Sequence, residues 1–477
     1  MRGLISLALA LIIVFVAAPV VSAGTAPTIK RVSVTGSPFA ADWAPLPDHA
    51  TVQLDLRRAG RATVSVLRPN GTLVRRLRSN AAVPKGVSSW VWDGRNDAGA
   101  PVGDGKYVVR AVVTNSSTGT ERAARGLRKG LPPIFPANPG AIVVAVDPGH
   151  GGRYPGAVNG EFMEKDFNLD IGLKLRDVLE RARVDVVMSR TTDTAVDEPA
   201  TDNNGDGVLN RYDDDLLRVD SKNTARADVA VHVHNNASSN PERHGTSVWI
   251  DPDRTWTPVA RDLATVLLEE EMVALEQYRS ASFAPRNAGV KTGWYYYMGP
   301  YDPPFLIRSS LVTSVLSESL FVTNESELAA LRRPELRTSL AAAIYLGLAR
   351  WLNSRDLGVG YELISGPSSV PAGGTAQFKV RVTNRGNAAT DHWTLQLRSV
   401  PSASVYDGSG ARGALIGSVA VPDDLAPGQS VELTVDITAP AQSGSWLVKS
   451  DVVLSGPTFA SDMGVVPLQI GLTTTAP

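Results

Sequence analysis

Five side chains capable of metal or proton chemistry lie where strands end or helices begin. His150 follows an apolar run in "AIVVAVDPGHGG", Glu164 opens "EKDFNLDIGLKLRDVL", and Glu318 lies in "SVLSES". His232 and His234 are two apart in "DVAVHVHNNAS", so a strand places them on one face. Two histidines and a glutamate can hold zinc with an open fourth position, and a further carboxylate can act as a base. Singly, a strand-end histidine is more often structural, and an acid at a helix start favours the helix dipole.

The segment 141–354 must position these side chains, and its pattern alternates strands with helices. Apolar strands are predicted at 141–146, 184–188, 228–234, 246–250 and 314–317. Helices are predicted at 164–183, from Thr257, where Pro258 follows, and across 325–353. Strands that are apolar on both faces and that alternate with helices indicate an α/β domain with a mixed or parallel sheet covered by helices. Ligands bind such sheets beyond the carboxyl ends of strands, where His150 is expected.

Two all-β Ig-like sandwich domains are predicted to flank this segment. Residues 25–131 alternate apolar and polar positions and resemble the Ig-like domain of flagellar hook-capping proteins, with Trp92 and Tyr107 as core aromatics. Residues 358–472 show the same alternation and resemble adhesion-type Ig-like modules. The proline-rich stretch 132–140 is expected to be a semi-rigid linker with few packing residues.

The composition and the N-terminal sequence limit the cellular compartment and the binding partners that are expected for this chain. Residues 1–23 read as a signal peptide ending in Val-Ser-Ala, with an uncleaved membrane anchor as the alternative. Export is expected in both cases, and no stable membrane association is expected after cleavage. The chain has no cysteine, which excludes thiol nucleophiles and Cys-ligated zinc. Its net charge of −1 argues against nucleic acid as a partner.

The ordered motifs "VDPGHGG", "EKDFNLDIGLKLRDVL", "VHVHNNA", "NAGVK" and "SVLSESLFVTN" resemble those of zinc-dependent N-acetylmuramoyl-L-alanine amidases of the two-histidine, one-glutamate class. The resemblance covers most of 141–353. It implies that His150, Glu164 and His234 hold zinc and that Glu318 is catalytic. The implied reaction is cleavage of the amide between N-acetylmuramic acid and L-alanine in peptidoglycan.

Two positions depart from the family pattern. His232 stands where the family has a small residue, and it is open to three roles: a partner of the ligands, a substrate contact or a competing ligand. We favour the first. Leu320 replaces a glycine two residues after the catalytic glutamate and is expected to narrow the space beside it. Neither departure removes a predicted ligand or the base.

An insertion after the second predicted strand carries a calcium-loop pattern. In "DNNGDGVLNRYD", residues 202–213, the spacing matches D-x-N-x-D-G with a carboxylate at the twelfth place. A solvated acidic loop with Asx turns is the alternative. The predicted calcium ligands are Asp202, Asn204, Asp206, the Val208 carbonyl, Asn210 and Asp213.

The sequence therefore predicts a secreted, zinc-dependent cell-wall hydrolase that acts on peptidoglycan. A zinc peptidase or amidase for another amide would share this site. A non-catalytic wall-binding or adhesion protein is the alternative from a different class, in which the Ig-like domains would engage a cell-surface partner. The complete set of predicted ligands with a base beside them favours the enzyme.

Overall fold

In a computed structural model, the 477-residue chain forms two compact units. One comprises Met1–Val34 with Ala50–Leu127, and the other comprises Thr35–His49 with Arg128–Pro477. The described residues are 26–40, 46–132, 134, 142–203, 205–252, 254, 256–293, 310–354, 358–386, 388–401, 413–454, 458–463, 465 and 467–476.

The first unit contains two β-sheets, in which the pairs β2–β5, β3–β4 and β3–β6 are antiparallel. One sheet has the order β1-β2-β5 and the other β4-β3-β6-β7. Strict alternation of buried and partly exposed positions along "ATVQLDL" explains why one face of β2 enters the core. Trp92 and Tyr107 are buried there with ring centroids 4.9 Å apart, as predicted. The strands are β1 (Ile29–Thr35), β2 (Ala50–Leu56), β3 (Gly60–Leu67), β4 (Leu73–Val83), β5 (Gly86–Trp92), β6 (Gly105–Asn115) and β7 (Gly119–Lys129).

The second unit contains a six-stranded mixed sheet with the order β11-β8-β12-β15-β13-β14. The strands β11, β8, β12 and β15 run parallel, whereas β13 is antiparallel to β15 and parallel to β14. The carboxyl ends of β8, β12 and β15 therefore meet at one edge. The strands are β8 (Val143–Pro148), β11 (Asp185–Met188), β12 (Val229–Asn236), β13 (Thr246–Ile250), β14 (Asn287–Thr292) and β15 (Ser314–Phe321), with a separate hairpin of β9 (Val158–Asn159) and β10 (Phe162–Met163).

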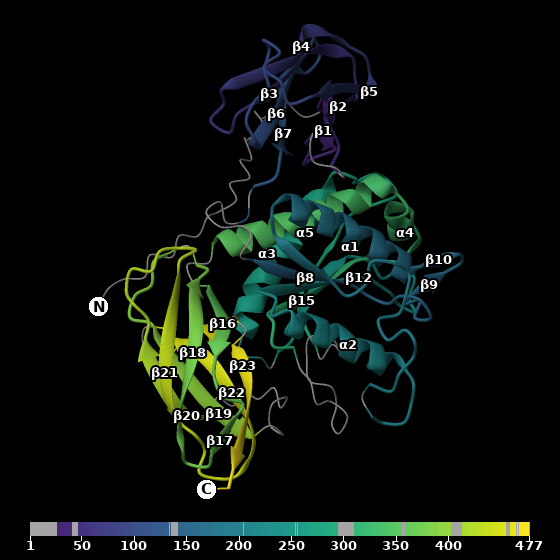
Figure 1. Cartoon of the computed structure of the whole chain (residues 1–477). Coiled ribbons are helices and arrows are strands. Elements are labelled where there is room, and N and C mark those ends of the chain that lie inside the picture. Colours follow the sequence, from purple (N-terminus) through teal and green to yellow (C-terminus); the bar gives the residue numbers. More distant parts are fainter. Residues whose placement is uncertain are drawn as a thin grey trace. The chain divides into compact units, whose positions relative to one another are not determined.

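Helices cover both faces of this sheet. Figure 1 shows α1, α3 and α5 on one side of the strands and α2 on the other. The apolar side chains of α1, including Ile171, Leu175 and Leu179, are fully buried against Val144, Val146 and their neighbours in one core. This α/β layering confirms the predicted architecture of the central segment. The helices are α1 (Glu164–Arg181), α2 (Arg211–Thr224), α3 (Thr257–Glu276), α4 (Glu325–Leu331) and α5 (Pro334–Asn353).

The helix α2 and the strand β14 were not predicted. Because α2 buries charged residues such as Arg218 and Lys222, apolar periodicity could not reveal it. A capping box between Asn210 and Asp213 starts the helix, so its signal was polar. The strand β14 has two glycine or alanine positions in six residues, "NAGVKT", and a weak strand pattern.

A second β-domain lies at the C-terminal end of this unit. It has a three-stranded sheet, β16-β18-β21, and a five-stranded sheet, β17-β23-β22-β19-β20, with a core of their own that includes Phe378, Leu395 and Val435. Its elements are β16 (Val359–Ser365), β17 (Ser369–Pro371), β18 (Thr375–Asn384), β19 (Thr394–Pro401), β20 (Ala414–Ala420), β21 (Ser430–Thr438), β22 (Gly444–Val453), the 3₁₀ turn η3 (Ala460–Met463) and β23 (Leu468–Thr475).

The predicted boundary at residue 131 differs from the observed one. Thr35–His49 and the chain from Arg128 group with the second unit, because Leu46, Leu131 and Ile134 are buried in the α/β core. The start of the predicted linker therefore packs, while residues 135–140 lie outside the described part. The predicted signal peptide, 1–23, also lies outside it. Within the described residues, no helix combines the length and apolar run that crossing a membrane requires.

Candidate metal centre

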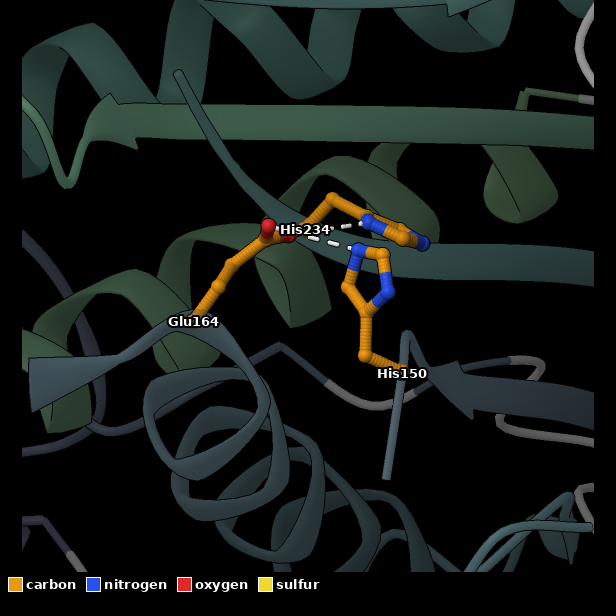
Figure 2. A group of neighbouring side chains, drawn as sticks. All are labelled: His150, Glu164 and His234. Carbon is orange, nitrogen blue, oxygen red and sulfur yellow. Dashed lines mark hydrogen bonds and ion pairs between the residues drawn. The ribbon is translucent and has the colours of Figure 1, made fainter. Parts of the chain in front are cut away.

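Three predicted ligands, His150, Glu164 and His234, come together at the carboxyl edge of the mixed sheet. His150 follows β8, Glu164 is the first residue of α1, and His234 lies near the end of β12. Each offers a ligand atom, and these atoms lie within 4.8 Å of one another. Glu164 bridges the rings: its Oε1 lies 3.0 Å from His234 Nδ1 and its Oε2 lies 3.3 Å from His150 Nε2, as Figure 2 shows. The group can therefore hold a metal ion.

Two glycines leave the space in which these side chains meet. A Cβ on Gly149 would lie 2.0 Å from His234 Nε2. A Cβ on Gly156, whose φ is +68°, would lie 2.6 Å from both Glu164 Oε2 and His150 Cδ2. The glycine-rich loop that precedes α1 is thus explained by close approach to the two imidazoles and the carboxylate.

Burial and mutual contact set the charge of the group. Burial raises the pKa of Glu164, but hydrogen bonds and charge interactions with His150 and His234 outweigh it and bring the pKa well below its ordinary value. Burial lowers the pKa of His234, against the opposing effect of Glu164. An ionised carboxylate with neutral imidazole is the protonation state that binds a divalent metal.

Glu318 lies directly beside this group. In the sheet His234 of β12 is paired with Glu318 of β15, so both side chains are on one face. Burial and then the charge of Glu164 raise the pKa of Glu318 well above its ordinary value, although Lys291 lowers it. Glu318 Oε2 is buried and has no hydrogen-bond partner among the described residues. A carboxyl group with an uncommitted oxygen next to a metal-type cluster can exchange a proton with a ligand.

A buried polar network holds the loop that carries His150. His150 has a left-handed backbone, with φ +61°, and its carbonyl accepts a hydrogen bond of 2.7 Å from Arg218 Nη2. Arg218 also bonds Asp147 at 2.6 Å, and Arg190 Nη2 donates to the Gly149 carbonyl at 3.1 Å. Sequence reasoning missed both arginines, because neither stands in a motif with the residues it supports.

Asn168 is a further supporting residue that the sequence could have revealed. It lies one helical turn after Glu164 and is fully buried. Its Nδ2 donates to Glu164 Oε1 at 3.1 Å and to the Gly149 carbonyl at 3.2 Å. The i, i+4 spacing from a predicted ligand was the available signal.

His232 precedes His234 by two residues in β12 and lies on the same face of the sheet. Its Nδ1 is 2.7 Å from Asp147 Oδ2 and its Nε2 is 2.9 Å from Lys222 Nζ, and the side chain is completely buried. Burial, then the charge of Lys222, lowers the pKa of His232 to about 3. It is not part of the grouping of ligand atoms. Its contacts link α2 to Asp147 and, through Arg218, to the His150 loop. Leu320, the other departure, is buried in the core.

The predicted calcium ligands do not form such a group in the described part of the chain, which excludes Asn204. Asp202 accepts hydrogen bonds from the backbone N–H groups of Gly205, Asp206 and Gly207. Asp213 accepts from Asn203 and Asn210 and is completely buried. Asn210 caps α2 through Tyr212 N, and the Val208 carbonyl accepts from Asn210 Nδ2. The hydrogen bonds named here are Asx turns and a helix cap, and calcium binding finds no support in them.

An α/β domain with two histidines and a glutamate at the carboxyl edge of its sheet is typical of zinc-type hydrolases. Residues 144–350 match the family of N-acetylmuramoyl-L-alanine amidases, and residues 48–117 match the FlgD Ig-like domain. The chain thus contains an N-acetylmuramoyl-L-alanine amidase domain and a FlgD Ig-like domain, and the resemblances predicted for these two regions are confirmed.

Individual relatives match over the same region. The germination-specific N-acetylmuramoyl-L-alanine amidase of Bacillus subtilis is 28% identical over 218 residues, which is 45% of this chain and 81% of that protein. The B. subtilis amidase LytC is 26% identical over 204 residues, which is 43% of this chain but only 34% of LytC. A crystal structure of an N-acetylmuramoyl-L-alanine amidase from Clostridium difficile 630 is 26% identical, with a TM-score of 0.36 and coverage of 45% of this chain and 97% of that one.

Proposed function

We propose that the chain is an exported zinc amidase that cleaves the bond between N-acetylmuramic acid and L-alanine in peptidoglycan. The observation that carries this proposal is the convergence of His150, Glu164 and His234 within 4.8 Å, with Glu318 paired to His234 in the sheet. The family match of residues 144–350 supports the choice of substrate.

The residues present fit a zinc ion. Two imidazoles and one carboxylate are a donor set that zinc accepts, with a position left for substrate. The space beside them is kept clear by Gly149 and Gly156, where a Cβ would collide with the ligands. Zinc bound by His150, Glu164 and His234 would supply a Lewis acid that activates water and polarises the amide carbonyl.

The chain's own residues then perform the remaining work. Glu318 would accept a proton from the attacking water and donate it to the leaving nitrogen of L-alanine. Its uncommitted Oε2 is available for this transfer. Arg218, Arg190 and Asn168 hold the loop and the carboxylate in place, so the ligands keep their positions while the substrate changes.

The regions outside the amidase domain define the setting of the reaction. We infer that residues 1–23 direct export, which brings the enzyme to the cell wall. The two sheets of residues 358–472 support an Ig-like assignment of the adhesion type for the C-terminal domain, whose partner would be a component of the cell surface.

Product analysis tests the proposal. Purified peptidoglycan incubated with the zinc-loaded chain should yield peptides with free N-terminal L-alanine and intact glycan strands, detected by mass spectrometry. The matched control is His150→Ala, which should yield none. Cleavage at another amide would point to a different hydrolase, and wall binding without any product would favour a binding protein.

Chelation separates a catalytic metal from a structural one. Because the α/β domain has a large apolar core of its own, removal of zinc should abolish lysis while the far-ultraviolet circular dichroism stays unchanged. Zinc added back should restore activity. A domain that melts on chelation would contradict the catalytic role.

A further inference from the structure

A half-buried lysine, Lys291, lies on the same face of the sheet as His234 and Glu318. The register carries this placement across four strands: His234 is paired with Glu318, Glu318 with Ser247, and Trp249 with Lys291. Ser247 and Trp249 are two residues apart in β13 and therefore share a face. Two strand spacings separate β14 from β15, so Lys291 is about 10 Å to the side of the Glu318 strand.

The ammonium group of Lys291 is held by an aromatic ring. Its Nζ lies 5.1 Å from the centroid of Trp249, within the range of a cation–π contact. Trp249 Nε1 in turn donates a hydrogen bond of 3.2 Å to Oγ of the buried Ser247. This bond fixes the indole beside Ser247, the residue that is paired with Glu318. The contact positions the lysine, which forms no salt bridge with a carboxylate among the described residues, although its charge lowers the pKa of Glu318.

The position of β14 that is paired with Ser247 has no side chain. Gly289 is paired with Ser247 and precedes Lys291 by two residues in β14. Its φ is +91°, and a Cβ there would meet no heavy atom of the described residues within 4 Å. A glycine of this kind in a strand allows another chain to approach the backbone closely. Among the described residues, no side chain therefore covers the backbone of β14 beside Ser247, the residue paired with Glu318.

We propose that Lys291, held on Trp249, binds a carboxylate in the peptide part of the substrate. This inference rests on the proposed function, which supplies a peptide on one side of the scissile amide. An extended peptide spans about 3.3–3.6 Å per residue, so a group about 10 Å away lies within three residues of the cleaved bond. An ammonium pairs with a carboxylate through a charge-assisted hydrogen bond, whereas a carboxamide at the same place forms a weaker neutral contact.

A pair of soluble substrates tests the inference on the full zinc-loaded chain. Both are N-acetylmuramoyl dipeptides that begin with L-alanine, and they differ only in a free α-carboxylate or its carboxamide on the second residue. The wild type should cleave the carboxylate substrate with a kcat/KM about tenfold higher, mainly through KM. Lys291→Gln should bring the two substrates to equal kcat/KM, and Lys291→Arg should retain most of the preference.

Lys174→Gln is the matched control. Lys174 lies ten residues along α1 from Glu164, about 15 Å, and is paired with Asp170. This variant should keep the wild-type preference. Equal cleavage of both substrates by the wild type would overturn the inference and leave the proposed function intact. A Lys291→Gln variant that loses kcat equally on both substrates but keeps the wild-type preference would show that Lys291 acts only through the pKa of Glu318, and would also overturn the inference.

Calorimetric binding of both dipeptides to Glu318→Gln measures the same preference without turnover. If the wild type cleaves neither substrate, the proposed function fails, and this binding ratio still decides the inference. A ratio near one would overturn it.

Discussion

Gly149 and His234 are packed so closely that a Cβ on Gly149 would lie 2.0 Å from His234 Nε2. Gly149→Ala is therefore expected to displace the imidazole from the group that it forms with Glu164 and His150. We expect zinc affinity to fall by at least about tenfold, in the range seen when the support of a metal ligand is lost. Competition with a chromophoric chelator measures this change.

Gly126→Ala is the control for that substitution. A Cβ added to Gly126 would meet no heavy atom of the described residues within 4 Å, and its φ is not left-handed, so the extra methyl should leave zinc binding unchanged. Wild-type affinity in Gly149→Ala would mean that His234 is not held where the metal binds.

Glu318→Gln tests the assignment of the base. The amide has nearly the same size but cannot accept a proton, so turnover should fall by about 10²–10⁴-fold while zinc stays bound. The measurement is the initial rate of peptide release together with the zinc content by atomic absorption. His150→Ala should lose both metal and turnover. Near-normal rates in Glu318→Gln would remove it as the base.

A second buried acid, Glu271 of α3, should make stability depend on pH. Ser317 and Ser319 donate to its Oε1 at 2.8 and 2.9 Å, and burial raises its pKa to about 7. The folded state therefore keeps a proton that the unfolded state loses near pH 4.5. Stability from this group is fully present below that pH and is lost as the pH rises through about 7, by about 3 kcal/mol.

Glu271→Gln should remove this dependence, because the neutral amide does not titrate. Thermal melts of both proteins from about pH 4.5 to about pH 8 should therefore converge or cross as the pH rises, with the wild type losing more. Glu269→Gln is the control on the same helix, since Glu269 is exposed and paired with Arg350. Parallel curves for the wild type and Glu271→Gln would contradict the prediction.

Calcium binding by residues 202–213 stays a prediction of the sequence. If the pattern is functional, calcium should raise the melting temperature of the zinc-loaded chain by about 2–4 °C, which corresponds to about 1 kcal/mol. Asp206→Ala should abolish the increment without changing zinc content, and magnesium should not replace calcium. Equal wild-type melts with and without calcium would identify the segment as the Asx-turn loop that its hydrogen bonds describe.

The sequence by itself determined the elements with a clear apolar pattern and the ligand candidates. The helix predicted from Thr257 begins there, and the strand 246–250 has the observed bounds, because apolar periodicity and Pro258 are local signals. The positions of residues at the ends or starts of elements made them candidates, and the resemblance to the amidases implied that His150, Glu164 and His234 are the ligands.

Only the tertiary structure decided which polar residues meet. His232 and His234 share a strand and a face, yet packing by α2 gives one to Asp147 and Lys222 and leaves the other with Glu164. Likewise, the position of Lys291 beside the site depends on the register of β14, a strand with a weak pattern. Periodicity fixes the direction of a side chain within one element. The partner it finds depends on long-range strand order and on which charges the packing can bury in pairs.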